Sequence, residues 1–76
     1  MTKQQFLHEL EQIIEVDPGS IQGDEPLKDL AGWDSMARVS FIAMADERLE
    51  ALVSPAQLAA CKSVPDLMAL FPDKIS

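Results

Sequence analysis

Apolar residues recur at helical spacing in the first part of the chain, over residues 2–16. They are Phe6, Leu7, Leu10, Ile13 and Ile14, with Glu9, Glu11 and Glu15 between them. This pattern predicts an amphipathic helix. Thr2 and Gln5 have the spacing of a capping box, which satisfies free amides of the first turn. The DPG sequence at 17–19 predicts the end of this helix, because proline cannot continue it.

Residues 17–33 show no sustained helical period, and they hold all three glycines of the chain. A connection of this length is uncommon in a small domain and is usually functional or disordered. Ile21, Leu27 and Leu30 are spaced along it as if to pin it onto a core. We therefore expect an ordered loop.

A second helix is predicted from Ser35 to Leu49 or Glu50, with Asp34 as its N-cap. Its first half, MARVSFIAMA, is apolar on nearly every side, whereas its second half, DERLE, is charged. A small domain cannot bury every side of one helix. Part of the first half should therefore be exposed as a patch for a partner or ligand, drawn from Met36, Ala37, Val39, Phe41 and Met44.

Two short helices follow. Ser54 and Pro55 predict the start of the third helix, and Ser63 and Pro65 predict the start of the fourth, which Pro72 ends. No segment alternates like a strand. The pattern predicts an all-α, four-helix fold in one domain over residues 1–76: two long helices separated by a long loop, then two short ones.

The charge balance narrows the function. Thirteen acidic and six basic residues give a net charge of −7, which argues against nucleic-acid binding and fits basic partner proteins. Asp46, Glu47 and Glu50 are the candidate contacts for such partners. No signal peptide and no apolar run near roughly 20 residues is present, so we expect a cytoplasmic protein away from the membrane. The single Cys61 excludes an internal disulfide and suggests a small filler on the third helix.

The sequence contains no convincing motif of a catalytic or metal site. A serine nucleophile needs a base within reach, and nothing in the spacing brings the only histidine, His8, to Ser35. The GWDSM sequence lacks the second glycine of a nucleophile elbow. One cysteine and one histidine cannot form a structural zinc site, and DPGSIQGDE does not match a calcium-binding loop. We expect neither an enzyme nor a metal site.

The sequence GWDSM at 32–36, preceded by LKDL at 27–30, resembles the attachment motif of acyl carrier proteins. The family pattern is a G-x-D-S-[LM] stretch that opens the second of four helices after a long loop. The resemblance extends over essentially the whole chain, through VSPA before the third helix and SVPDLMAL in the fourth.

This resemblance implies a specific chemistry. Ser35 would receive a 4′-phosphopantetheine arm from coenzyme A through a separate phosphopantetheinyl transferase, and Asp34 would cap the helix and help the transferase. The arm would carry thioester-linked acyl, aminoacyl or peptidyl groups, on a monomer, between a loading enzyme and downstream enzymes of fatty-acid, polyketide or nonribosomal peptide synthesis. The residues expected to contact these partners are Met36, Arg38, Val39, Met44, Asp46 and Glu47.

Some residues depart from the fatty-acid carriers of this family. Arg38 and Arg48 stand in a helix that those carriers keep strongly acidic, and Ser40 stands where an acidic residue is common. Trp33, expected as a semi-buried loop anchor, also resembles specialised carriers more than the housekeeping form. These departures favour a carrier dedicated to one pathway. The alternative is a small acidic helical interaction module that is never modified, and modification separates the two.

Overall fold

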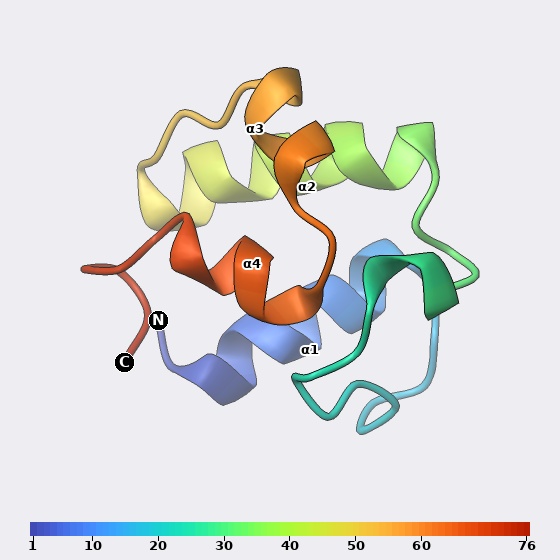
Figure 1. Cartoon of the computed structure of the whole chain (residues 1–76). Coiled ribbons are helices and arrows are strands. Elements are labelled where there is room, and N and C mark those ends of the chain that lie inside the picture. The colour runs from blue at the N-terminus through green and yellow to red at the C-terminus, as the bar shows by residue number, and fades with distance from the viewer.

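Four α-helices, each begun by a side-chain cap, form the computed structural model, which describes residues 1–76. They are α1 (Lys3–Ile13), α2 (Ser35–Leu49), α3 (Pro55–Ala60) and α4 (Val64–Ala69), and a short 3-10 helix, η1 (Leu27–Asp29), lies in the long loop. No strand is present. The predicted all-α fold of two long and two short helices is confirmed (Figure 1).

The predicted caps are present at all four helix starts. Thr2 and Gln5 form a reciprocal capping box on α1, and Ser54 and Gln57 form one on α3. The side chains of Asp34 and Ser63 accept first-turn amides of α2 and α4. Each cap satisfies amides that have no acceptor within their own helix, so these short sequences define where the helices begin.

The end of α1 differs from the prediction. The helix stops at Ile13 rather than at residue 16, because Glu15 adopts a left-handed conformation with φ of 60°. The amide of Glu15 donates to the Gln12 carbonyl (3.2 Å), and the amide of Val16 donates to the Glu11 carbonyl (3.0 Å). This bond pair is a Schellman motif, which turns the chain before Pro18 is reached.

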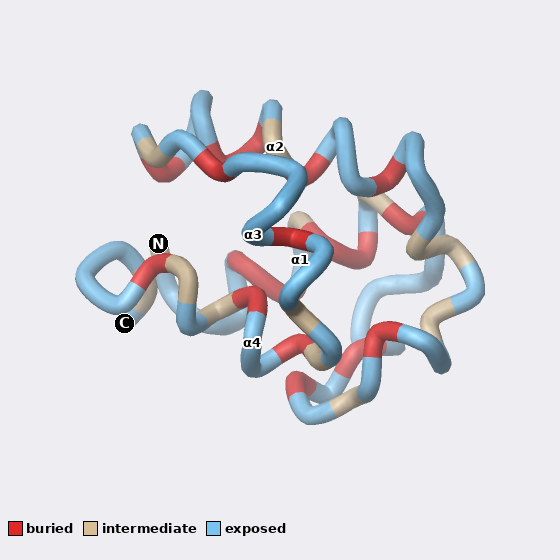
Figure 2. The backbone as a smooth tube through the Cα atoms, turned by 45° about the horizontal axis from the view of Figure 1, so that its top comes forward, coloured by how far each residue is buried: buried red, intermediate tan, exposed pale blue.

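The core lies between α1 and α2, with α4 packed across them (Figure 1). Buried positions occupy the inward sides of the helices, and the outward sides are exposed (Figure 2). All three phenylalanines of the chain meet there. The ring centroids of Phe6 and Phe41 are 5.9 Å apart, and Phe71 lies 6.2 Å and 6.0 Å from them. Aromatic pairs at such separations add to the stabilisation from burial.

The long loop is fastened to α1 by Glu11, a residue that is only 4% exposed. One carboxylate oxygen accepts the backbone amides of Gly19 (2.8 Å) and Ile21 (3.0 Å). The helical pattern placed Glu11 among the polar positions of the helix, and its burial was not anticipated. The loop is ordered as predicted, with Ile21 and Leu27 buried and Leu30 partly buried against the core.

The loop is also joined to the segment between α3 and α4. The amide of Leu27 donates to the Lys62 carbonyl, and the amide of Val64 donates to the Glu25 carbonyl, both at 2.9 Å. These two bonds form an isolated antiparallel bridge centred on Pro26 and Ser63. They hold the segment that contains η1 against the chain that leaves α3.

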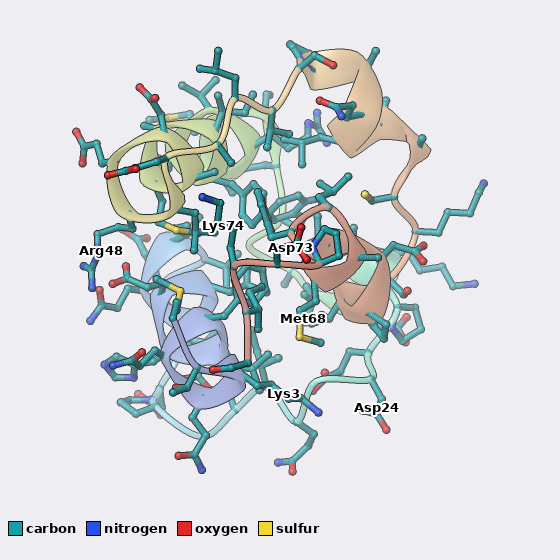
Figure 3. The ribbon with its side chains drawn as sticks, turned by 90° about the vertical axis from the view of Figure 1, so that its left-hand side faces the viewer. Lys3, Asp24, Arg48, Met68, Asp73 and Lys74 are labelled. Atoms are coloured by element: carbon teal, nitrogen blue, oxygen red, sulfur yellow. The ribbon has the colours of Figure 1, made fainter.

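A surface ion pair links the two long helices. Arg48 near the end of α2 lies 2.8 Å from a carboxylate oxygen of Glu9 on α1. Arg48 lies at the outer edge of the molecule, where α2 crosses above α1 (Figure 3). Its side chain is 55% exposed, so water and salt screen the pair, and its contribution to stability is small.

The turn at 22–25 is organised by Glu25. Its carboxylate accepts the backbone amides of Gln22 (2.6 Å), Gly23 (2.9 Å) and Asp24 (3.1 Å). Desolvation acts to raise the pKa of Glu25, but the backbone donors together outweigh it and lower the pKa below its ordinary value. The ionised form therefore stabilises this turn.

We predict that Glu11→Ala lowers the free energy of unfolding by about 2–4 kcal/mol, because two loop amides lose their charged acceptor. Urea denaturation followed by circular dichroism measures the loss. Glu9→Ala is the control: it removes a carboxylate two residues earlier on α1 that pairs only with exposed Arg48, at a cost of about 1 kcal/mol or less. Equal losses in the two variants would contradict the role assigned to Glu11.

We predict that Glu25→Gln destabilises the protein at neutral pH and that the difference from wild type disappears in acid. A carboxyl group with a lowered folded-state pKa stabilises the fold above its ordinary pKa, and this contribution is lost as pH falls through the folded-state pKa. Urea midpoints across an acidic pH series test this. Glu47→Gln alters an exposed carboxylate without a hydrogen bond and should show no such convergence. A pH-independent gap for Glu25→Gln would refute the assignment.

Candidate functional site

Gly32 lies against the end of α1 so closely that no side chain fits. A Cβ atom at this position would lie 2.3 Å from the carbonyl oxygen of Ile14 and 2.8 Å from its Cβ atom. The backbone of the GWDSM segment is therefore in direct contact with the C-cap residue of α1. This contact explains the glycine by lack of space rather than by an unusual φ.

Trp33, which follows Gly32, packs its side chain against the core. Its half-buried ring meets the ring of Phe41 edge to face, with centroids 5.7 Å apart and an interplanar angle of 81°. Its backbone amide donates to the Leu30 carbonyl at 3.0 Å. The predicted role of Trp33 as a semi-buried loop anchor is confirmed. The start of α2 is thus held against the aromatic cluster of the core.

Asp34 is the N-cap of α2, as predicted. Its backbone is extended, and its Oδ1 atom accepts the amide of Ala37 at 2.9 Å. Its carbonyl accepts the amide of Arg38 at 3.0 Å, which is the first backbone bond of the helix. A carboxylate at this end also complements the positive pole of the helix dipole. Asp34 therefore sets the register at which Ser35 enters the helix.

Ser35 is the first residue of α2 and is exposed. Its hydroxyl makes no hydrogen bond to any protein group, and the backbone amides of Ser35 and Met36 have no acceptor. The only histidine, His8, lies on α1, where its ring contacts Gln12 (3.3 Å) and Glu11 (3.7 Å). The site thus presents a free hydroxyl beside two free amides, and neither His8 nor Asp34 accepts a hydrogen bond from it.

A groove of about 1310 Å³ opens beside Ser35. One wall is the loop around η1, the second is the first half of α2, and the third is α3 with the residues that follow it. The apolar part of its lining is formed by Leu27, Leu30, Ala31, Trp33, Val39, Ile42, Leu58, Ala59 and Cys61. Ser35 belongs to the same lining, so a group attached to its oxygen can enter the groove.

Cys61 lies in this groove as the C-cap of α3. Its half-buried thiol donates a weak hydrogen bond to the carbonyl of Gln57 (3.4 Å between Sγ and O). Burial raises the pKa of the Cys61 thiol, and the negative charge of Asp66 raises it further. The thiol therefore stays protonated at neutral pH, in agreement with the filler role expected from the sequence.

The expected partner-contact residues divide into two groups. Met36 is 79% and Val39 is 67% exposed, and Arg38, Asp46 and Glu47 also lie on the surface. Met44 is only 7% exposed, so the expectation that it contacts partners is wrong. Like Ala37 and Phe41, it lies on the side of α2 that faces the core.

Three surface features were not singled out from the sequence. Leu52, in the connection between α2 and α3, is 88% exposed, and Lys28 and Lys62 line the groove. Leu52 follows no helical period, and the two lysines are far apart in the chain, so no local pattern marked them. No group of three or more potential metal ligands gathers in the structure, and none of its helices has the length and apolarity to cross a bilayer.

The chain matches a known protein family over most of its length. Residues 4–71 match the family described as "Phosphopantetheine attachment site", which covers the four helices and the loop that leads to Ser35. Neither the curated proteins nor the solved structures include a match to this chain.

We predict that Gly32→Ala lowers the free energy of unfolding by about 1–3 kcal/mol, because the new methyl group collides with the Ile14 carbonyl and forces the loop outward. Amide chemical shifts of residues 33–37 should move with it, since Trp33 and Asp34 follow in the chain. Ala31→Gly is the control: it loosens the adjacent position without a clash and should cost less than about 1 kcal/mol. Unchanged stability in Gly32→Ala would rule out the close contact.

Proposed function

This chain belongs to the family of phosphopantetheine attachment domains, and we propose that it is a carrier protein modified at Ser35. The prosthetic group of the family is 4′-phosphopantetheine, which is bound covalently. The observation that carries the proposal is the free Ser35 hydroxyl at the first position of α2, within the matched residues. We propose that residues 1–76 act as one carrier domain.

The residues around Ser35 fit a phosphodiester. The amides of Ser35 and Met36 have no acceptor in the protein, and a helix N-terminus favours an anion through its free amides and its dipole. The hydroxyl is exposed, so an enzyme can reach it. When bound, the phosphopantetheine group supplies a terminal thiol that holds an acyl group as a thioester.

The residues of this chain hold the attachment point in place. Gly32 contacts α1, Trp33 packs on Phe41, and Asp34 caps the helix that Ser35 begins. We propose that a separate phosphopantetheinyl transferase activates the hydroxyl, because no side chain of this chain accepts a hydrogen bond from it and the carboxylate of Asp34 is engaged with the Ala37 amide. In this proposal the chain performs no catalysis of its own.

Carrier domains of this family work with transferases and biosynthetic enzymes. We propose that Met36 and Val39 contact these partners through their exposed apolar side chains, flanked by Arg38 and, further along α2, by Asp46 and Glu47. Apolar residues ringed by charged ones are typical of protein-contact surfaces. The partners are the transferase, an acyl- or aminoacyl-loading enzyme and downstream enzymes, met by a cytoplasmic monomer.

The charge of α2 supports a carrier that serves one dedicated pathway. Fatty-acid, polyketide and nonribosomal peptide synthesis all use carriers of this kind. Arg38 is exposed one turn after Ser35 and supports a carrier dedicated to one pathway. A cation beside the attachment point repels the basic surfaces of enzymes that bind an acidic helix.

We predict that the purified protein gains one phosphopantetheine unit when it is incubated with coenzyme A and a broad-specificity phosphopantetheinyl transferase. Intact-mass spectrometry measures the gain. Ser35→Ala should gain nothing, and Ser40→Ala, which removes another exposed serine of the same helix, should be modified like wild type. If the wild type gains no mass while a control carrier is modified, the chain is instead an unmodified interaction module.

The stability of each variant must be measured alongside its modification. Ser35→Ala should keep the stability of the wild type, because its hydroxyl makes no hydrogen bond and Asp34 still caps the helix. Asp34→Ala should lose about 1 kcal/mol with its cap and should be modified more slowly. Circular dichroism and urea midpoints separate these effects from unfolding.

A further inference from the structure

The basic residues of this acidic chain are concentrated around one groove. The sequence has 6 basic and 13 acidic residues. Lys28, Arg38 and Lys62, half of the basic set, line the groove beside Ser35, and no acidic residue lines it. The charged side chains that line the groove are therefore all positive, although the net charge of the chain is −7. One carboxylate lies close to it: Asp66 accepts the backbone amide of Lys62 at 2.9 Å and acts on the Cys61 thiol.

The three cations come from three different walls. Lys28 belongs to η1, Arg38 to α2, and Lys62 to the segment after α3. All three are exposed, and none forms an ion pair within the protein, because the only ion pairs are Arg48–Glu9 and His8–Glu11. The fold thus leaves their charges available to a ligand.

The lining between these cations is apolar. Leu27 and Leu58 are buried there, and Ile42 is partly buried. An alkyl chain in the groove would leave water, which is favourable in proportion to the apolar area removed. A negative group on the same ligand would meet exposed cations without partners of their own, with which it can form charge-assisted hydrogen bonds.

We propose that the groove binds an acyl group that carries a carboxylate at its far end, tethered to Ser35. This inference rests on the proposed function, because the phosphopantetheine arm on Ser35 delivers the acyl group. Tethering matters for an anion: the net charge of −7 repels free acidic molecules and acidic partner surfaces, whereas a tethered group reaches the groove at high effective concentration.

The test compares two loaded forms made without a partner enzyme. A broad-specificity transferase moves acyl-phosphopantetheine from acyl-coenzyme A to the Ser35 oxygen, where a phosphodiester forms and 3′,5′-adenosine bisphosphate leaves. Adipoyl-coenzyme A supplies the carboxylate-bearing cargo, and heptanoyl-coenzyme A supplies an uncharged chain of similar length. Intact mass confirms complete loading before each measurement.

The readout is the alkylation rate of Cys61 by iodoacetamide. Cys61 lines the groove, and the thiol of the arm is blocked by the acyl group, so the rate reports how often the groove is filled. The adipoyl form should be alkylated about three- to tenfold more slowly than the heptanoyl form, the range expected for a carboxylate among several cations. High salt should reduce the difference.

Variants that remove positive charge test whether the groove cations cause the difference in alkylation rate. In Arg38→Gln with Lys62→Gln the difference between the two acyl forms should shrink strongly, because only Lys28 of the three groove cations remains. Lys3→Gln with Lys74→Gln removes the same charge outside the groove and should preserve the difference. Circular dichroism shows that both double variants are folded.

Each result leads to one conclusion. No mass gain with an active transferase defeats the proposed function and this inference with it. Complete loading with equal Cys61 rates, or with stronger protection by heptanoyl, overturns the inference alone and leaves the carrier role standing. An undiminished difference in Arg38→Gln with Lys62→Gln also overturns it, because removing two of the three cations would then have had no effect.

Discussion

Phe41 connects the core of this protein to its functional end. Its ring packs against Phe6 of α1 and against Phe71, and Trp33 packs against it edge to face. Phe41 lies on α2 less than two turns from Ser35, so the rings that bury it also hold the start of this helix. The position of an exposed hydroxyl therefore depends on the tight packing of buried aromatic side chains, which resists displacement.

The long loop is held by hydrogen bonds and by one close backbone contact, in addition to its buried apolar residues. Glu11 accepts two loop amides, Gly32 lies against Ile14, and the backbone bridge around Pro26 and Ser63 ties the loop to the segment after α3. Buried or half-buried backbone groups need such partners, because an unpaired amide away from water is costly. The bridge also joins Leu27 to Lys62, and both residues line the groove, so the loop is both a connection and part of the site.

Family membership explains the fold and the prosthetic group of this chain, whereas its charge bears on the cargo. The match to phosphopantetheine attachment domains accounts for the helical fold and for a covalent prosthetic group. It leaves the cargo open, since fold alone does not define function. The charge does bear on the cargo that we propose, because a chain with a net charge of −7 has a groove lined by Lys28, Arg38 and Lys62. In the proposed carrier, the net charge repels free acidic molecules, whereas a tethered anion can still reach the groove.

The sequence by itself determined the helix starts, the four-helix order and the placement of Ser35 after its cap, because capping acts between residues three apart. Tertiary structure decided the rest. α1 ends early because Glu15 adopts a left-handed conformation, which no local sequence pattern indicates. The first half of α2 is apolar on nearly every side, so its sequence alone does not show which face is buried, and packing against the neighbouring helices buries Met44. The burial of Glu11 and the assembly of the basic groove depend on segments far apart in the chain, whose contacts exist only after folding.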